Sequence, residues 1–169
     1  MTLPSEWRFA GVLARHNGEV ILVRESHERW GGEFWSLPGG MVEAHEGPAE
    51  GAARELAEET GLVVPSPSLR LRTTTTVMLD GVPLHSWNFE VEVEDPTVQV
   101  QDPDLLVKEA RWFALDQAVA LLRVLPYRPL ADPAVATLTT EATGKTHWMF
   151  ASPEADPHVS PSSSKGARL

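Results

Sequence analysis

The 169-residue sequence contains no cysteine, which excludes disulfide bonds, thiolate metal sites and every mechanism that uses a thiol nucleophile. Any bound metal ion must therefore have oxygen or imidazole ligands. The sequence also lacks an apolar run of the roughly 20 residues that a membrane-spanning helix needs. Residues 1–6 show neither the basic region nor the apolar run of a secretion signal. We therefore expect a cytoplasmic globular protein with no membrane partner.

Basic residues are scarce, since 14 lysines and arginines stand against 24 acidic residues and leave a formal net charge of −10. Such a charge repels DNA and RNA unless the basic residues gather in a stripe, and the sequence shows no stripe. We therefore expect no nucleic-acid partner. An acidic protein can still bind a phosphate compound if a carboxylate cluster holds a divalent cation, because the cation inverts the local field.

The length and the apolar pattern predict one domain of α/β class over residues 1–150 and a flexible tail over residues 151–169. The tail is rich in proline, serine and glycine, and it has too few apolar residues to offset the entropy of ordering. Asn17-Gly18 and Asp80-Gly81 each separate two apolar runs, which is typical of β-hairpins. Further elements are predicted at these ranges: loops at 25–38 and 94–104, strands at 108–113 and 146–150, and helices at 116–125 and 132–140.

Residues 48–60 predict an α-helix with two contrasting faces. Pro48 suits its first turn and Gly61 suits its C-terminal cap. One face consists mainly of alanines, which allow close packing on a sheet. The opposite face carries three carboxylates within an arc of about 100°, because they are spaced i, i+3 and i+4: Glu55, Glu58 and Glu59.

These three carboxylates repel one another, at a cost of a few tenths of a kcal/mol per pair in an isolated helix. A hard divalent cation removes the conflict, and oxygen ligands that must also meet phosphate oxygens indicate Mg²⁺ or Mn²⁺ rather than a dedicated zinc site. Three glutamates alone are more often a solvated helix face. The neighbouring residues therefore decide between the two interpretations.

The segment from residue 40 to residue 62 fits a 23-residue pattern without a gap, G-x5-E-x7-R-E-U-x-E-E-x-G-U, where U is a bulky aliphatic residue. The matching residues are Gly40, Glu46, Arg54, Glu55, Leu56, Glu58, Glu59, Gly61 and Leu62. This pattern is the signature of the Nudix hydrolases, so the chain resembles that family. The resemblance extends more weakly over residues 7–125.

The resemblance implies a Nudix-type α/β/α sandwich, with a mixed β-sheet between helices. It also implies hydrolysis of a nucleoside di- or triphosphate, or of another nucleoside diphosphate linked to a group X, by water attack on phosphorus. The metal would be held by Glu55, Glu58, Glu59 and the carbonyl of Gly40, while Arg54 and Glu46 would orient the site.

The general base varies within the family, so several acids remain candidates. Glu58 and Glu59 come first, and Asp104 and Glu109 follow as downstream alternatives.

Substrate contacts are expected outside the signature as well. Arg24 could meet phosphates, and Trp30 and Phe34 could stack on a base, whereas Trp35 and Phe89 are expected in the core. Together with Glu109, the predicted substrate-binding residues are thus Arg24, Trp30 and Phe34.

Two alternatives share the fold but differ in function. A Nudix-type isomerase needs a catalytic cysteine, which this sequence lacks. A non-catalytic nucleotide-sensing domain usually loses the signature carboxylates, which are complete here. Met41 stands where the enzymes that cleave oxidised guanine nucleotides carry lysine, which argues against that specific activity, and the substrate stays open. Similar enzymes commonly form dimers, so a homodimer stays open too.

Overall fold

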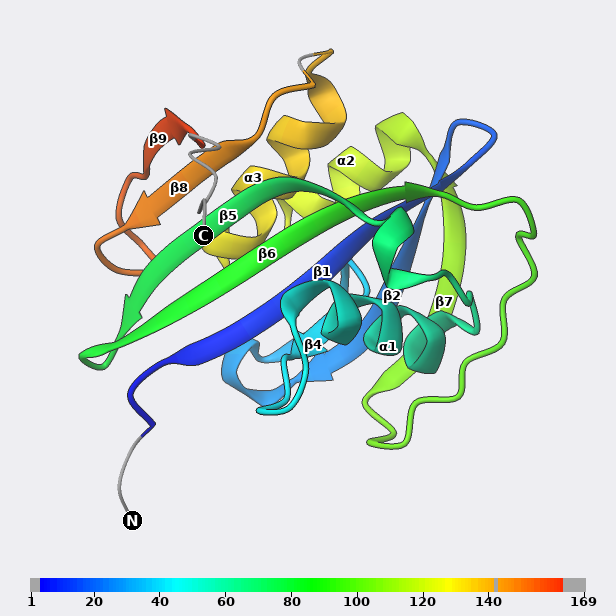
Figure 1. Ribbon diagram of the computed structural model, residues 1–169, viewed down its shortest axis with the longest axis horizontal. Coiled ribbons are helices and arrows are strands. Elements are labelled where there is room, and N and C mark those ends of the chain that lie inside the picture. Colours follow the sequence, from blue (N-terminus) through cyan, green and yellow to red (C-terminus); the bar gives the residue numbers. More distant parts are fainter. Residues whose placement is uncertain (1–3, 142, 163–169) are drawn as a thin grey trace, which may run out of the picture.

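The computed structural model describes residues 4–141 and 143–162. Within these residues nine strands form one mixed sheet, and three α-helices and two short 3₁₀ helices accompany it (Figure 1). The strands are β1 (Trp7–His16), β2 (Glu19–His27), β3 (Gly32–Ser36), β4 (Gly39–Met41), β5 (Arg70–Leu79), β6 (Val82–Glu92), β7 (Val107–Ala114), β8 (Thr146–Phe150) and β9 (His158–Pro161). The helices are α1 (Pro48–Thr60), α2 (Leu115–Arg123), α3 (Arg128–Thr139), η1 (Glu28–Trp30) and η2 (Ser66–Ser68).

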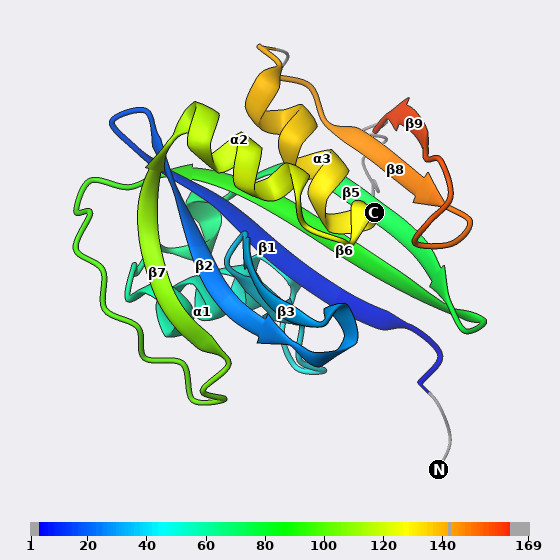
Figure 2. The ribbon, with the colours of Figure 1, turned by 180° about the vertical axis from the view of Figure 1, so that it is seen from behind.

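The sheet has the strand order β3-β2-β1-β6-β5-β8-β9, while β4 pairs with β1 and β7 pairs with β2. β1 and β6 run parallel, as do β5 and β8, and the remaining pairs are antiparallel. α1 covers one face of the sheet, and α2 and α3 cover the other (Figures 1 and 2). The predicted α/β/α architecture is therefore confirmed.

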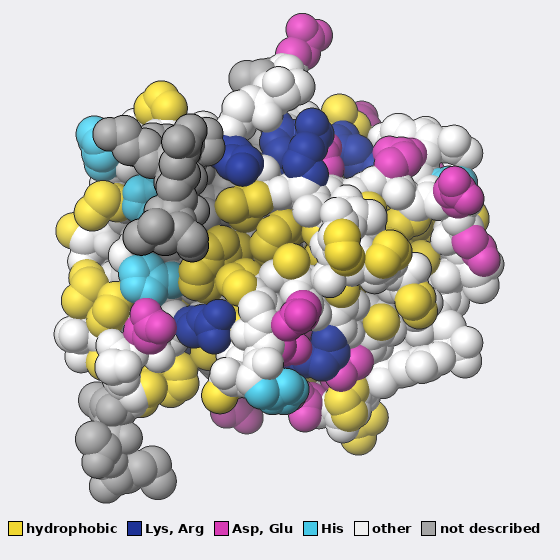
Figure 3. Space-filling view, viewed as in Figure 1, with side chains coloured by type: hydrophobic (Ala, Val, Ile, Leu, Met, Phe, Trp, Pro, Cys, Tyr) yellow, Lys and Arg dark blue, Asp and Glu magenta, His cyan; other side chains and the backbone are white. Residues whose placement is uncertain are grey.

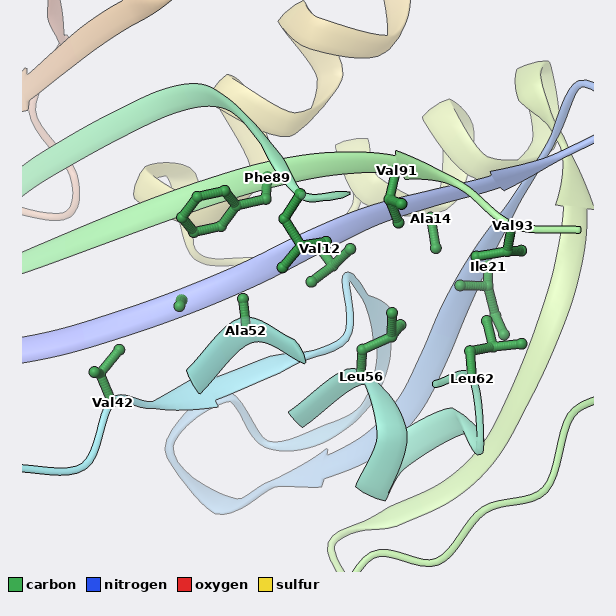
Figure 4. Close-up of a cluster of buried hydrophobic side chains, with 12 residues drawn as sticks. Val12, Ala14, Ile21, Val42, Ala52, Leu56, Leu62, Phe89, Val91 and Val93 are labelled. Carbon is green, nitrogen blue, oxygen red and sulfur yellow. The ribbon is translucent and has the colours of Figure 1, made fainter. Parts of the chain in front are cut away.

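Successive side chains of β1 point to opposite faces of the sheet and so feed two hydrophobic clusters. Ala10 and Val12 join Ala52 and Leu56 of α1 in the first cluster, which Figure 4 shows. Leu13 joins residues of α2 and α3 in the second cluster. Phe89 is 6% exposed and belongs to the first cluster, as predicted. Trp35 packs against the second cluster.

No helix within the described residues has the length and apolarity to cross a membrane.

The bounds of α1 agree with the prediction, and Gly61 caps the helix in the left-handed conformation, at φ 79°. The later helices begin earlier than predicted. α2 starts at Leu115, with Ala114 rather than Asp116 at the N-cap position, and α3 starts at Arg128, where Pro129 suits its first turn.

Two predictions of irregular structure differ from the fold. Residues 25–38 were predicted to form a loop, but β2 continues to His27 and β3 pairs with it antiparallel. Part of the predicted tail is also a strand, because β9 pairs with β8 as far as Pro161. Residues 163–169 lie outside the described residues. Both strands gain backbone hydrogen bonds from a neighbour, which neither local composition nor apolar periodicity reveals.

Candidate active site

A cleft of about 860 Å³ reaches from α1 to the segment that leads into α3. Its volume lies within the roughly 300 to 1,000 Å³ that is typical of small-molecule sites. One wall, the acidic wall, includes Gly39, Gly40, Glu55 and Glu59. The facing segments supply aromatic residues, so the cleft combines a charged part with an apolar part.

Arg54 organises the acidic wall. Its Nη2 donates to Glu46 Oε1 at 2.6 Å and to the carbonyl of Met41 at 3.0 Å. Its Nη1 donates to Glu55 Oε1 at 2.8 Å and to Glu58 Oε2 at 3.2 Å. A planar guanidinium can hold several acceptors in fixed directions, which an ammonium group cannot do. The predicted orienting pair of Arg54 and Glu46 is therefore brought together, and Figure 3 shows acidic and basic side chains interspersed over this region.

The same hydrogen bonds set the charge state of Glu46. The guanidinium of Arg54 holds the pKa of Glu46 below its usual range, and the hydrogen bond from the Glu43 N–H to Glu46 Oε1, at 2.9 Å, acts in the same direction. Glu46 is therefore the acid in this cluster that most firmly stays ionised beside Arg54.

Glu59 is the most buried of the predicted site residues, with 6% of its surface exposed. Burial raises its pKa to about 9, and the nearby acids Glu25, Glu55 and Asp102 add to that shift. A hydrogen bond of 2.9 Å from the Gly39 N–H to Glu59 Oε2 opposes the shift without overcoming it. Glu59 therefore holds a proton at neutral pH unless a cation compensates its charge.

Gly39 and Gly40 allow β4 to pass between β1 and α1. A Cβ at Gly39 would lie 2.5 Å from the Ala10 carbonyl oxygen, and a Cβ at Gly40 would lie 2.4 Å from the Glu55 carboxyl group. Burial also raises the pKa of Glu55, and Glu58 and Asp104 add to this, although Arg54 opposes it. The glycines thus bring backbone and carboxylates together at the positions that the sequence predicts.

The chemistry of these donors fits a hard divalent cation. Burial raises the pKa values of Glu55 and Glu59, so a nearby cation would stabilise their charged forms, and carboxylate oxygens suit Mg²⁺ or Mn²⁺. In the positions that the described side chains occupy, no group of three acidic or histidine residues converges on one point. Arg54 engages Glu55 and Glu58, while Gly39 engages Glu59. Each of these hydrogen bonds uses one carboxylate oxygen, Glu55 Oε1, Glu58 Oε2 and Glu59 Oε2 respectively.

The other predicted site residues divide into two groups. Trp30 and Asp104 line the cleft. Arg24, Phe34 and Glu109 are described residues that do not line it. Arg24 faces Glu109 across the pairing of β2 with β7, and Nη2 of Arg24 lies 3.1 Å from Glu109 Oε2. Cross-strand pairing therefore satisfies both charges, which leaves Glu109 as a weaker candidate base.

The residues that line the cleft and that sequence reasoning missed include Glu25, Asp102 and Tyr127. Glu25 accepts a hydrogen bond from Ser36 Oγ at 3.1 Å. Asp102 accepts hydrogen bonds from the backbone N–H groups of Leu106 and Val107, at 2.7 and 2.9 Å, and so shapes the loop before β7. The acidic segment around Asp102 was a detectable signal, whereas no local pattern marked Glu25 or Tyr127.

Comparison with known proteins places this site in a family. The NUDIX domain profile matches residues 5–136. "Phosphatase NudJ" of Escherichia coli is 32% identical over 121 residues, which cover 70% of this chain and 71% of that protein. "Putative 8-oxo-dGTP diphosphatase 3" of Mycobacterium tuberculosis is 30% identical over 118 residues, which cover 66% and 54% respectively. Three other curated relatives match over 51 to 55 residues, so this chain spans only 14 to 33% of their lengths.

A solved structure shows a similar fold. The crystal structure of a NUDIX hydrolase from Nitrosomonas europaea matches with a TM-score of 0.68 and 21% identity, covering 85% of this chain and 76% of that one. The family profile spans most of the chain and contains the whole acidic wall. The chain therefore belongs to the Nudix hydrolase family.

Proposed function

We propose that this protein is a metal-dependent pyrophosphohydrolase that cleaves a nucleoside di- or triphosphate, or another nucleoside diphosphate conjugate, by water attack on phosphorus. The observation that carries the proposal is the set of buried, mutually repelling carboxylates on the wall of a cleft large enough for a nucleotide. Members of the family generally use divalent metal ions.

Glu55 and Glu58, with the carbonyl of Gly40, are the proposed ligands for Mg²⁺ or Mn²⁺. A bound ion would neutralise phosphate charge and lower the pKa of a water ligand. Arg54 and Glu46 position Glu55, because the Arg54 guanidinium contacts the carboxylates of both Glu46 and Glu55.

Glu59 is the proposed proton acceptor. It lines the cleft, whereas Glu58, the other preferred candidate, does not. With a cation bound nearby, the Glu59 carboxylate would stay ionised and could accept the proton of the attacking water.

A substrate panel tests the proposal directly. The panel consists of nucleoside tri- and diphosphates, ADP-ribose, dinucleoside polyphosphates and nucleotide sugars, each assayed with Mg²⁺, with Mn²⁺ and with a chelator. We expect metal-dependent release of phosphate, diphosphate or a nucleotide from at least one class, with no release in the chelator. Nucleotide binding without turnover of any compound would refute the hydrolase assignment and favour a sensing domain.

Alanine at Gly40 should separate catalysis from folding. The added Cβ displaces only the end of the flexible Glu55 side chain, so we expect kcat to fall by about 100-fold, as for a small misplacement of a catalytic group, with little change in Tm. Gly39→Ala meets backbone atoms instead and should lower the stability by roughly 1 to 3 kcal/mol or more.

Gly47→Ala is the matched control for both substitutions, because the nearest atom to its Cβ position lies 3.8 Å away. Steady-state kinetics and thermal unfolding of the three variants provide the measurements. A Gly40→Ala protein with the kcat of the wild type would contradict the role that we assign to Glu55.

A further inference from the structure

The loop between β8 and β9 adds a wall to the cleft from outside the matched family region. The family profile ends at residue 136, whereas β8 and β9 follow it and extend the sheet beyond β5 (Figure 2). Pro153 and Glu154 of the connecting loop line the cleft. This part of the cleft is therefore supplied by a segment that the shared family pattern does not include.

Arg128 fastens this loop to the start of α3. Its Nη1 lies 3.1 Å from Asp156 Oδ1 and donates to the Ala155 carbonyl at 3.4 Å, while its Nε donates to Asp132 Oδ2 at 3.0 Å. Exposed ion pairs of this kind contribute about 1 kcal/mol or less each. The Ala155 N–H also closes a turn on the Ser152 carbonyl at 3.1 Å. These contacts fix the loop that carries the exposed Glu154, whose charge acts on Tyr127, the residue before Arg128.

Two aromatic rings lie at the same part of the cleft. Trp30 of η1 and Tyr127 stack with their centroids 5.7 Å apart and their planes inclined by 21°. They come from segments almost 100 residues apart in the sequence, and both line the cleft. Flat rings in a cleft offer π faces on which a heterocycle can stack, at about 1 to 3 kcal/mol per base.

The hydroxyl group of Tyr127 is buried and has no hydrogen-bond partner in the described part of the chain. Burial raises the pKa of Tyr127 to about 12, so this group keeps its proton, and the charges of Arg29 and Glu154 both act on it. A buried hydroxyl without a partner costs about 1 to 3 kcal/mol. A ligand atom that accepts or donates a hydrogen bond here would recover that cost.

We propose that Glu154, Tyr127 and Trp30 form the base subsite of this enzyme, and that the subsite selects a nucleobase whose pairing edge carries a ring N–H, as in guanine. This inference rests on the proposed function and names its substrate class. The carboxylate of Glu154 can only accept hydrogen bonds, and the adjacent N1–H and N2–H groups of guanine match its two oxygens. Adenine presents a ring nitrogen acceptor at that position, which a carboxylate repels. The guanine carbonyl would accept a hydrogen bond from Tyr127.

The test compares base preference rather than activity alone. kcat/KM is measured for GTP, ITP, ATP, CTP and UTP in the wild type, Glu154→Gln and Tyr127→Phe. We expect the wild type to prefer GTP over ATP by at least tenfold, and each variant to reduce that ratio by about tenfold. Glu141→Gln, which changes an exposed acid outside the cleft, should keep both the ratio and the rates of the wild type.

Calorimetric titration with GMP and AMP separates failure of this inference from failure of the proposed function. If no compound of the substrate panel is hydrolysed, the hydrolase assignment fails, while tighter binding of GMP that weakens in Glu154→Gln still supports the subsite. A wild-type protein that prefers ATP or AMP would overturn the subsite assignment. The subsite assignment would also be overturned if neither Glu154→Gln nor Tyr127→Phe changes the ratio of kcat/KM for GTP to that for ATP.

Discussion

Glutamine at Glu59 should lower kcat by about 1,000-fold and at the same time make the protein more stable in a chelator at about pH 8. The loss of rate follows from removal of the proposed proton acceptor, a role that typically contributes about 10² to 10⁴-fold. The gain in stability follows from burial, because glutamine places no ionisable group in this site. Opposite effects on rate and stability distinguish a functional carboxylate from a structural one.

The pH dependence of this effect has a definite sign. The pKa of Glu59 is about 9 in the folded protein, against an ordinary value of 4.5. Between these values the folded state keeps a proton that the unfolded state has lost, so the stability falls as the pH rises. Each pKa unit corresponds to about 1.4 kcal/mol. We therefore expect Glu59→Gln to gain at least about 2 kcal/mol at about pH 8 and almost nothing at about pH 4.

Thermal unfolding in EDTA between about pH 4 and pH 9, combined with kinetics in Mg²⁺, measures both effects. Glu58→Gln is the matched control, because Glu58 has 31% of its side chain exposed and lies beside Arg54. It should lose activity without the pH-dependent gain in Tm. A constant difference in Tm between Glu59→Gln and the wild type at every pH would show that Glu59 is not protonated in the fold.

Removal of the Arg54 side chain should have the second largest effect. Arg54→Ala leaves Glu46, Glu55 and Glu58 without their shared cation. We expect kcat/KM to fall by about 100-fold, because Glu55 loses its orientation, and the stability to fall by roughly 2 to 3 kcal/mol. Arg54→Lys should lie between this variant and the wild type, since lysine keeps the charge but cannot engage all the acceptors together.

The loss of stability should depend on pH through Glu46, whose pKa is lowered by Arg54. The stabilisation is complete above the ordinary pKa of 4.5 and disappears as the pH falls through the lower folded value. The gap in Tm between Arg54→Ala and the wild type should therefore narrow in acid. Arg123→Ala, at an exposed position in the last turn of α2, controls for loss of one positive charge. Equal gaps in acidic and neutral buffer would argue against the Arg54–Glu46 contact.

The sequence was most informative where residues that begin or end a helix, or a fixed spacing along it, determine the local structure. Pro48 and Gly61 delimit α1, and the i, i+3 and i+4 positions put three glutamates on one face, so the bounds and the acidic wall could be predicted. Long-range pairing was not predictable in this way. Arg24 and Glu109 were predicted as substrate contacts from their residue types, whereas the register of β2 and β7, which places them opposite each other, could not be predicted.

The aromatic part of the cleft could not be predicted from local sequence either, because it also depends on long-range packing. Tyr127 and Glu154 reach it only because α3 and β8 pack on the far half of the sheet. Glu25 belongs to a strand, but the glycines and aromatic residues that follow it had led to the prediction of a loop. Trp30 was singled out because its polar, glycine-rich surroundings are unusual for a core tryptophan, and the structure places it on the lining of the cleft.

The two parallel strand pairs carry a consequence for the order in which the molecule forms. β1 must pair with β6 across 77 residues, and β5 must pair with β8 across 73. Closing such long loops is slow, whereas α1 depends on local hydrogen bonds and can appear early. We therefore expect the local hydrogen bonds of α1 to form before the long-range strand pairs that complete the facing wall of the cleft.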